Sequence, residues 1–308
     1  MARIDVHQHL LPPDYVAWLT DRGIGESGGR DLPEWSTATA LELMDRYDIR
    51  AAVLSLSTPG TYLGDGRDAL RMARTVNEFA SAAHHEHPDR IGFFATVPLP
   101  DVEGSIAEVK HALDNLHADG VILLANNSGT YLGDPSFEPL MAELNERSAV
   151  VFVHPHALPG PDVPGLPAFA ADFLLDTTRA AMNLVKHDVL RRYPNLKFIL
   201  AHAGGFLPYA SHRIMAALFA DTGRLIPDIL EDFSSFYFDT ALSSSPAALP
   251  SLLAFAKPGH VLFGSDWPFA PELAVAYFTA HLDRYLLDDD VRASINEGAA
   301  VELFPHFA

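Results

Sequence analysis

The stretch RIDVHQH (residues 3–9) has the composition of a buried strand and ends in two histidines. Side chains at positions i and i+2 of a strand point to the same face. We therefore expect His7 and His9 to project together from the strand end, with Gln8 turned away. Neutral imidazole is the commonest protein ligand for metal ions, so the pair is a candidate half of a metal site. A His-x-His pair alone is more often structural, and the rest of the chain has to decide.

Seven further apolar runs follow, and segments with helical periodicity lie between them. The eight runs span residues 3–9, 51–57, 90–99, 119–126, 149–155, 197–204, 236–241 and 260–268. Most are continuously hydrophobic, which is typical of parallel strands buried on both faces. Helical spacing is clear in residues 40–49, 69–85, 105–117 and 137–147. The alternation predicts an α/β fold, a single (β/α)8 TIM barrel. An open doubly wound sheet is the alternative, disfavoured because no glycine-rich phosphate-binding motif follows the first strand.

No linker, charge block or low-complexity tract divides the chain, so we predict one barrel domain over residues 1–308. Long loops are expected after the first strand (residues 10–37) and after the fifth strand (residues 156–172). Both connections leave the carboxyl ends of strands, which is the face where such barrels carry their active sites.

A short repeat, GTYLGD, occurs at residues 60–65 and again at 129–134, each time after an even-numbered strand. Shared turn chemistry of glycine and aspartate is the interpretation that we favour. The alternative interpretation is that Tyr62 and Tyr131 lie at the mouth of a pocket.

Charge and composition narrow the possible partners and the possible chemistry. The net charge of −19 argues against binding to nucleic acid or to an anionic membrane surface. The chain has no cysteine, so a metal ion would need His, Asp or Glu ligands. The sequence contains neither a recognisable secretion leader nor an apolar run of membrane-spanning length. We therefore expect a cytoplasmic protein that acts on a small molecule.

Potential metal ligands recur where the predicted strands end. His154 ends the fifth run, His202 the sixth and Asp266 the eighth, in addition to His7 and His9 on the first. Each has an ordinary structural explanation by itself, but a barrel brings these strand ends into one cup. The combination therefore predicts a metal site with three or more imidazoles and a carboxylate. Two other strand aspartates are interpreted as structural, namely Asp5 and Asp239.

The same residues resemble the pattern of the amidohydrolase superfamily. The local sequences IDVHQHLLP, VFVHP, FILAHAGGFLPYASHRI, YFDTA and LFGSDWPF are similar to its "amidohydrolase 2" branch. That branch includes aminocarboxymuconate-semialdehyde decarboxylase and the hydroxybenzoate decarboxylases. The resemblance runs from the first strand to the eighth, so it implies a barrel enzyme that uses a metal ion.

The resemblance also implies how many ions are bound and by which residues. Binuclear members of the superfamily carry a bridging lysine on the fourth strand, where this chain reads GVILLANN. One divalent ion is therefore expected, with zinc as the first expectation and manganese as the alternative. The implied ligands are His7, His9, His154 and Asp266. His202 and Asp266 are the implied acid and base.

Two reactions fit such a site. The first expectation is non-oxidative decarboxylation of an aromatic or unsaturated-ring carboxylic acid, and the alternative is hydrolysis of a lactone, ester or amide. A non-catalytic binding protein is a third class, against which the long loops and the complete ligand set argue.

Four more residues are candidates for binding the substrate. Arg30 and Arg213 resemble arginines that hold the substrate carboxylate in the decarboxylases, and the second implies a homodimer because it reaches a neighbouring subunit. Trp267 is a candidate apolar wall, and His156 is a candidate pocket residue. A solvated arginine or a packed core residue is the structural alternative in each case.

Overall fold

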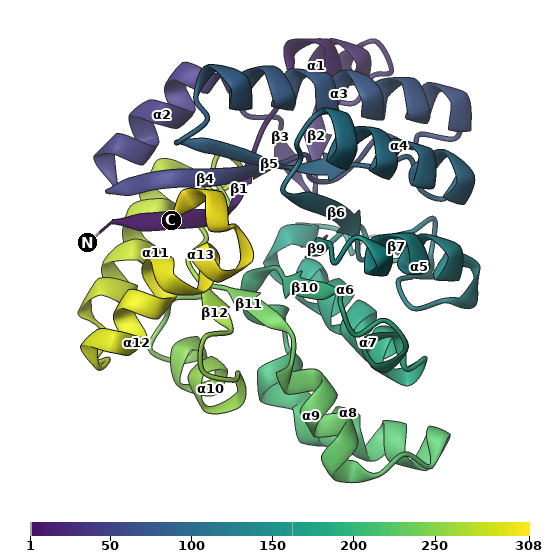
Figure 1. The fold of residues 1–308 in the computed structure, drawn as a ribbon, viewed down its shortest axis with the longest axis vertical. Coiled ribbons are helices and arrows are strands. Elements are labelled where there is room, and N and C mark those ends of the chain that lie inside the picture. The colour runs from purple at the N-terminus through teal and green to yellow at the C-terminus, as the bar shows by residue number, and fades with distance from the viewer. Residues whose placement is uncertain (1, 162) are drawn as a thin grey trace.

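The structure, a computed structural model, describes residues 2–161 and 163–308. Its centre is a sheet of eight parallel strands that follow one another in chain order (Figure 1). The strands are β1 (Arg3–His9), β4 (Ile49–Ser55), β5 (Ile91–Thr96), β6 (Gly120–Leu124), β9 (Val150–His154), β10 (Lys197–Leu200), β11 (Tyr237–Asp239) and β12 (Val261–Leu262). Each overlaps one predicted run, and β4 begins two residues earlier than expected.

Hydrogen bonds between β1 and the segment that begins with β12 close the sheet into a barrel. The Val6 N–H donates to the Phe263 carbonyl at 3.0 Å. Further along, the His9 N–H donates to the Trp267 carbonyl, and the Asp266 N–H donates to the His7 carbonyl, both at 2.7 Å. The predicted (β/α)8 barrel is therefore confirmed, and the open doubly wound sheet is excluded.

A helix follows each barrel strand and packs outside it. These helices are α2 (Thr37–Arg46), α3 (Gly66–Glu86), α4 (Val102–Asn115), α5 (Glu138–Glu146), α6 (Ala168–Lys186), α8 (Leu207–Thr222), α10 (Ala248–Phe255) and α11 (Glu272–Arg284). Side-chain caps fix several of their first turns: the Asp65 carboxylate accepts the Asp68 N–H at α3, and Ser36 and Thr39 form a capping box at α2. The four helices expected from periodicity are α2, α3, α4 and α5.

The long connections contain short elements of their own. After β1 come helix α1 (Pro13–Thr20) and a small hairpin of β2 (Glu26–Ser27) and β3 (Arg30–Asp31). After β6 comes a second hairpin, β7 (Asn126–Asn127) with β8 (Thr130–Tyr131). The connection after β9 lacks regular structure until α6 begins at residue 168, and its residue 162 lies outside the described part of the chain. Shorter helices complete the outer layer, namely α7 (Val189–Arg192), α9 (Ile226–Ser234), α12 (Asp289–Ala293) and α13 (Ala299–Leu303).

Both copies of GTYLGD use their glycines and aspartate in the same way, although only the second copy contains a strand, β8. The first and last glycines of each copy have positive φ angles of 74° and 102° in one copy and 85° and 94° in the other, a backbone region that disfavours other residues. The closing aspartates, Asp65 and Asp134, each cap the helix that follows. Shared turn chemistry therefore explains the repeat.

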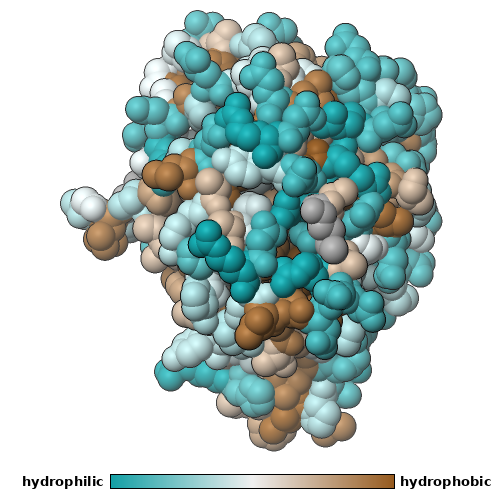
Figure 2. Space-filling model, turned by 90° about the vertical axis from the view of Figure 1, so that its left-hand side faces the viewer, coloured by the Kyte–Doolittle hydropathy of each residue, from teal (hydrophilic) through white to brown (hydrophobic). Residues whose placement is uncertain are grey.

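The inside of the barrel is filled with apolar side chains, and the end of the chain closes its amino-terminal side. Phe304, which follows α13, and Phe307, from the short helix η4 (Pro305–Phe307), pack against Ile4, Phe94 and Phe152. We call this group the bottom plug. Within the described residues, no helix has both the length and the apolar character needed to cross a membrane. Figure 2 shows a largely hydrophilic face whose hydrophobic side chains gather at the lower end, where α8 and α9 lie in Figure 1.

Candidate metal centre

A bulge in β1 turns both histidines of the opening motif into the barrel. Ile4 and Val6 belong to the inner core, so strict alternation would send His7 and His9 outward. The pairing of β1 with β4 shifts register between Asp5 and Gln8, which is the signature of an inserted residue. His7 and His9 are consequently buried completely, with their Nε2 atoms 3.1 Å apart.

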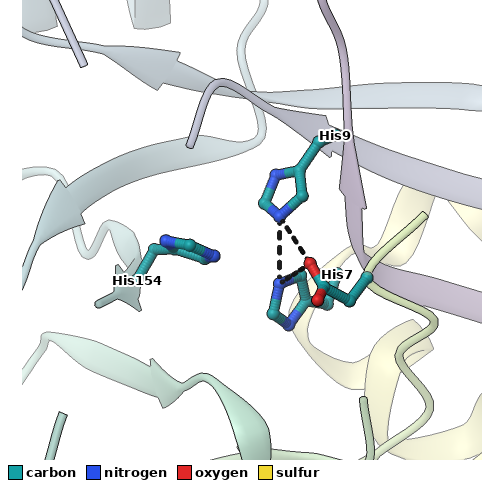
Figure 3. Close-up of side chains that lie close together, drawn as sticks. His7, His9 and His154 are labelled. Carbon is teal, nitrogen blue, oxygen red and sulfur yellow. Dashed lines mark hydrogen bonds and ion pairs between the residues drawn. The ribbon is translucent and has the colours of Figure 1, made fainter. Parts of the chain in front are cut away.

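Two more predicted residues converge on this pair. His154 ends β9, and Asp266 follows β12, so three strand ends of the sequence prediction meet in space. Figure 3 shows the three histidines. Potential ligand atoms of His7, His9, His154 and Asp266 all lie within 4.8 Å of one another. Asp266 Oδ1 lies 3.0 Å from His9 Nε2 and 3.3 Å from His7 Nε2. The arrangement is a compact buried cluster of three nitrogens and one oxygen, the donor set expected for a divalent ion.

Hydrogen bonds on the far side of each ring fix the tautomers of the three histidines. His7 Nδ1 lies 2.7 Å from Asp239 Oδ2, and His154 Nδ1 lies 2.8 Å from the Pro155 carbonyl. His9 Nδ1 lies 3.2 Å from the Ser55 carbonyl. Because these partners accept hydrogen bonds, each Nδ1 carries the proton and each Nε2 directs a lone pair into the cluster. Lone pairs and a carboxylate at this spacing repel one another unless a cation lies among them, so the residues fit a bound metal ion.

The pKa values of the cluster agree with that conclusion. Burial lowers the pKa of His9 and lowers that of His154 well below its usual range, so both rings are neutral and able to bind a metal. Burial also acts to lower the pKa of His7, but Asp239 and Asp266 outweigh it and raise the value to about 10. For Asp266, burial is outweighed by hydrogen bonds with His202, His7 and His9, which hold the pKa of this carboxyl well below its usual range. Without a bound ion, the two carboxylates therefore keep a second proton on His7, at Nε2, and a bound cation would take the place of that proton.

His202 lies beside the cluster and does not belong to it. Its Nε2 is 3.5 Å from Asp266 Oδ2, and its Nδ1 is buried without a hydrogen-bond partner among the described residues. The φ angles of His202 and Asp266 are 54° and 63°, in the left-handed region that non-glycine residues rarely adopt. Such backbone strain is typical of functional sites, where the surrounding fold imposes it.

Asp239 has a larger role than the sequence suggested. Besides accepting from His7 Nδ1, it accepts the backbone N–H of His202 at 2.9 Å and that of Ala241 at 2.9 Å. One buried carboxylate thus orients a candidate ligand and the candidate acid, which is the usual function of a residue behind a metal ligand. A sequence feature that could have indicated this role is the position of Asp239 as the last residue of a buried strand. Asp5 is structural as expected, since it accepts hydrogen bonds from the backbone and hydroxyl of Ser265.

A cavity of about 320 Å³ opens above His154, His202 and Asp266. Its walls are largely aromatic and aliphatic, and four phenylalanines contribute to them: Phe169, Phe173, Phe269 and Phe278. Arg30, on the hairpin strand β3, also lines this cavity, and its guanidinium carbon lies 3.9 Å from the centre of the Phe169 ring. We call this cavity the metal pocket.

The three remaining candidates lie elsewhere. Trp267 packs in a small core beside Ala40 and Leu43, its carbonyl accepts the His9 N–H, and it is not among the residues that line the metal pocket. His156 lines a neighbouring cavity, and its Nδ1 lies 2.6 Å from Thr58 Oγ1. Arg213 is exposed on α8 and forms no hydrogen bond or ion pair with the described residues. Neither Trp267 nor Arg213 lines the metal pocket of its own chain.

Comparisons with known proteins identify the family. The sequence model of the amidohydrolase family matches residues 4–306, so the chain belongs to this family. 6-Methylsalicylic acid decarboxylase of Penicillium expansum is 40% identical over 314 residues, covering 99% of this chain and 97% of that protein. A crystal structure described as amidohydrolase II has a TM-score of 0.92 and 31% identity, covering 99% of this chain and 100% of that one.

A more distant structure resembles the fold. Dihydroxybenzoic acid decarboxylase of Polaromonas sp., solved with bound manganese and 2-nitroresorcinol, has a TM-score of 0.81 and 22% identity. The match covers 99% of this chain and 97% of that one. The resemblance predicted from the strand-end motifs is thus confirmed at the level of the family.

Proposed function

We infer that the chain is a metal-dependent decarboxylase, and we propose a 2-hydroxybenzoic acid with an apolar ring substituent as its substrate. The observation that carries the proposal is the metal pocket, where a cluster of potential metal ligands lies under aromatic walls and beside Arg30. The 40% identity to 6-methylsalicylic acid decarboxylase supports both the reaction and the substrate class. The alternative of ester or lactone hydrolysis is not favoured by these relatives.

The proposed ligands of one divalent ion are His7, His9, His154 and Asp266. A divalent ion bound there supplies positive charge for the carboxylate and the adjacent hydroxyl oxygen of a 2-hydroxybenzoate. Three imidazoles and a carboxylate suit zinc, and manganese is also compatible. Manganese has the additional support that the Polaromonas decarboxylase was solved with it.

His202 and Asp266 are the proposed source of the proton that the reaction consumes. His202 Nε2 and Asp266 Oδ2 are 3.5 Å apart at the metal pocket, so a proton held on the imidazole lies between the carboxylate and the space for the substrate. The proton is added to the ring carbon that bears the carboxylate. The bond between that carbon and the carboxylate then breaks, its electron pair restores the aromatic ring, and CO₂ leaves.

Arg30 and the phenylalanines are proposed to orient the substrate. Stacking on Phe169 restricts the Arg30 guanidinium, so less side-chain entropy is lost when it pairs with a carboxylate. The apolar walls exclude water and accommodate a ring with a methyl group. A second carboxylate on the ring would find no further Lys or Arg among the described residues of the lining.

We also propose a homodimer that buries the exposed face of α8. This face carries Arg213 and, one helical turn before it, Tyr209, which is 87% exposed. Single exposed apolar residues are ordinary, but an exposed tyrosine beside an unpaired arginine is typical of an interface. If Arg213 completes the partner's pocket, then Arg213→Ala should weaken substrate binding by about 30- to 1000-fold with metal content unchanged. A fully active monomer would remove Arg213 from the site.

The direct test is a CO₂-release assay with metal-loaded protein. We expect release from 2-hydroxybenzoate and 2-hydroxy-6-methylbenzoate, and little from 4-hydroxybenzoate, whose hydroxyl is too far from the carboxylate to share the same cation. A panel of esters and lactones is run beside it. Hydrolysis of any of these without CO₂ release from the ring acids would overturn the proposal.

A further inference from the structure

A second cavity of about 450 Å³ opens at the carboxyl ends of β4, β5, β6 and β9, beside the metal pocket. We propose that this cavity binds a neutral phenol, the class of compound that decarboxylation of a hydroxybenzoate produces. The identity of the ligand as a product rests on the proposed function, while its neutral, hydroxyl-bearing character rests on the cavity. We call this cavity the side cavity.

The side cavity and the metal pocket share a wall. In the loop after β4, Ser57 and Thr58 line the metal pocket, and the next residues, Pro59 to Tyr62, line the side cavity. On β9 and beyond, His154 lines the metal pocket and His156 lines the side cavity. The 2.6 Å contact between Thr58 Oγ1 and His156 Nδ1 joins the two loops. A ligand in the side cavity would therefore touch the residues that position one wall of the metal pocket.

The lining of the side cavity selects against a charged ligand. None of the described residues that line it is Asp, Glu, Lys or Arg. Transfer of a carboxylate into such a site costs several kcal/mol unless a cation accompanies it, and the net charge of −19 adds to that cost. The metal pocket differs, since it offers Arg30 and the metal ligands. Loss of CO₂ changes an anion that suits the metal pocket into a neutral ring that suits the side cavity.

The side cavity also offers hydrogen bonds for a hydroxyl group. His156 uses Nδ1 for Thr58, and its Nε2 has no partner among the described residues. A phenolic hydroxyl both donates and accepts, so it can pair with this nitrogen in either tautomer. The Tyr62 hydroxyl, also in the lining, is likewise without a partner in the described part of the chain.

Buried apolar side chains form part of the walls, as a ring-binding site requires. Leu56, Leu99 and Leu123 are buried members of the lining. The buried Asp176 carboxylate holds two lining residues in place, because it accepts hydrogen bonds from the His156 backbone N–H at 2.8 Å and from the Asn126 side-chain amide at 2.9 Å. One copy of the GTYLGD turn supplies Gly60 to Tyr62, and the first glycine of the other copy supplies the opposite rim. Both turns are thus used to shape the same cavity.

Calorimetric titration of metal-loaded protein with 3-methylphenol tests the binding site without reference to activity. Wild-type protein should bind 3-methylphenol, and Ala157→Phe, which adds a ring to an exposed position of the lining, should bind it about tenfold or more weakly. Tyr62→Phe removes only a hydroxyl and should weaken binding by about three- to tenfold. Ala157→Ser is the matched control and should bind as wild type does. Equal binding by wild type and Ala157→Phe, or loss of binding in Asp266→Ala, would overturn the proposal.

Product inhibition gives the second readout. With 2-hydroxy-6-methylbenzoate as substrate, 3-methylphenol should lower the maximal rate of the wild-type enzyme even at saturating substrate. In Ala157→Phe this part of the inhibition should disappear, while the rate without added 3-methylphenol stays unchanged. Purely competitive inhibition of the wild type would contradict the side cavity. If no ring acid releases CO₂ but the titration gives the expected pattern, the proposed reaction fails and the neutral-phenol site stands.

Discussion

The two ends of the barrel are built on opposite principles. At the carboxyl ends of the strands, buried polar groups are concentrated: three histidines, two aspartates and His202 lie in mutual contact, and two of these residues have strained backbones. At the amino-terminal ends, the bottom plug fills the interior with aromatic and aliphatic side chains. The comparison teaches that stability and chemistry are separated along the barrel axis, as in barrel enzymes generally. Substitutions at one end should therefore leave the property of the other end intact.

The largest effect is expected from removing the carboxylate at the centre of the metal site. Asp266→Ala should reduce bound metal to far below one equivalent per chain and abolish CO₂ release, because three neutral imidazoles remain without the anionic ligand. Elemental analysis of dialysed protein and the CO₂ assay measure the two quantities. Two tightly bound metal ions per wild-type chain, or a variant that keeps its metal, would contradict the assigned site.

A substitution of His202 tests proton transfer separately from metal binding at the carboxyl end of the barrel. His202→Ala should lower turnover by about 10²- to 10⁴-fold while the metal content stays at the wild-type level. His85→Ala, which changes an exposed histidine on α3, is the control and should behave as wild type. Loss of the metal together with the activity in His202→Ala would instead make His202 a ligand.

At the bottom of the barrel the expected effect falls on stability alone. Phe307 is 2% exposed and packs in the bottom plug, so Phe307→Ala should lower the free energy of unfolding by about 3–5 kcal/mol. Urea unfolding measures this loss, and turnover below the unfolding transition should not change. Phe219→Ala is the matched control, because that ring is 47% exposed and its loss should cost far less. A large fall in turnover for folded Phe307→Ala would break the separation of the two ends.

The smallest expected effect is a dependence of stability on pH, caused by a residue at the amino-terminal end of the barrel. Burial raises the pKa of Asp119 to about 6, against the opposing influence of His306 and of the hydrogen bond from the Phe93 N–H. Between its ordinary value of 3.8 and about 6, the folded chain holds more protons at this site than the unfolded chain, so stability falls as the pH rises through that window. Asp119→Asn should therefore become more stable relative to wild type by about 1–3 kcal/mol as the pH rises from about 4 to about 7.

Urea unfolding at several pH values measures this difference. The exposed Asp89, in Asp89→Asn, provides the control and should show no such trend. The same trend in both variants would assign the effect to net charge rather than to the burial of Asp119.

The fold was accessible from the sequence because the signals for it are strong and repeated. Eight apolar runs mark the eight strands. Continuous apolar runs are typical of parallel strands buried on both faces, so the runs also indicate that these strands pair with one another in parallel. The two-residue strands of the hairpins after β1 and β6 left no such signal, since they are too short to show alternation. The predicted cluster of His7, His9, His154 and Asp266 followed from the barrel, which brings strand ends together.

Other parts of the site depend on geometry that the sequence does not display. The bulge in β1 is a register shift with its partner strand, so it has no counterpart in the order of residues. Asp239 was interpreted as structural because its contact with His7 spans more than 200 residues. Trp267 was a candidate wall because it follows Asp266, yet the turn after β12 directs its ring into a small core.

The way the barrel closes has a consequence for the synthesis of the chain. His7 and His9 lie on β1, Asp266 lies more than 250 residues later, beyond β12, and the hydrogen bonds that join β1 to this segment also bring these residues together. A ribosome has therefore made the whole stretch from His7 to Asp266 before the four ligands can meet. Acquisition of the ion becomes a late event in biogenesis, and a prematurely terminated chain that lacks the closing segment would carry the first two histidines without a site to bind the ion.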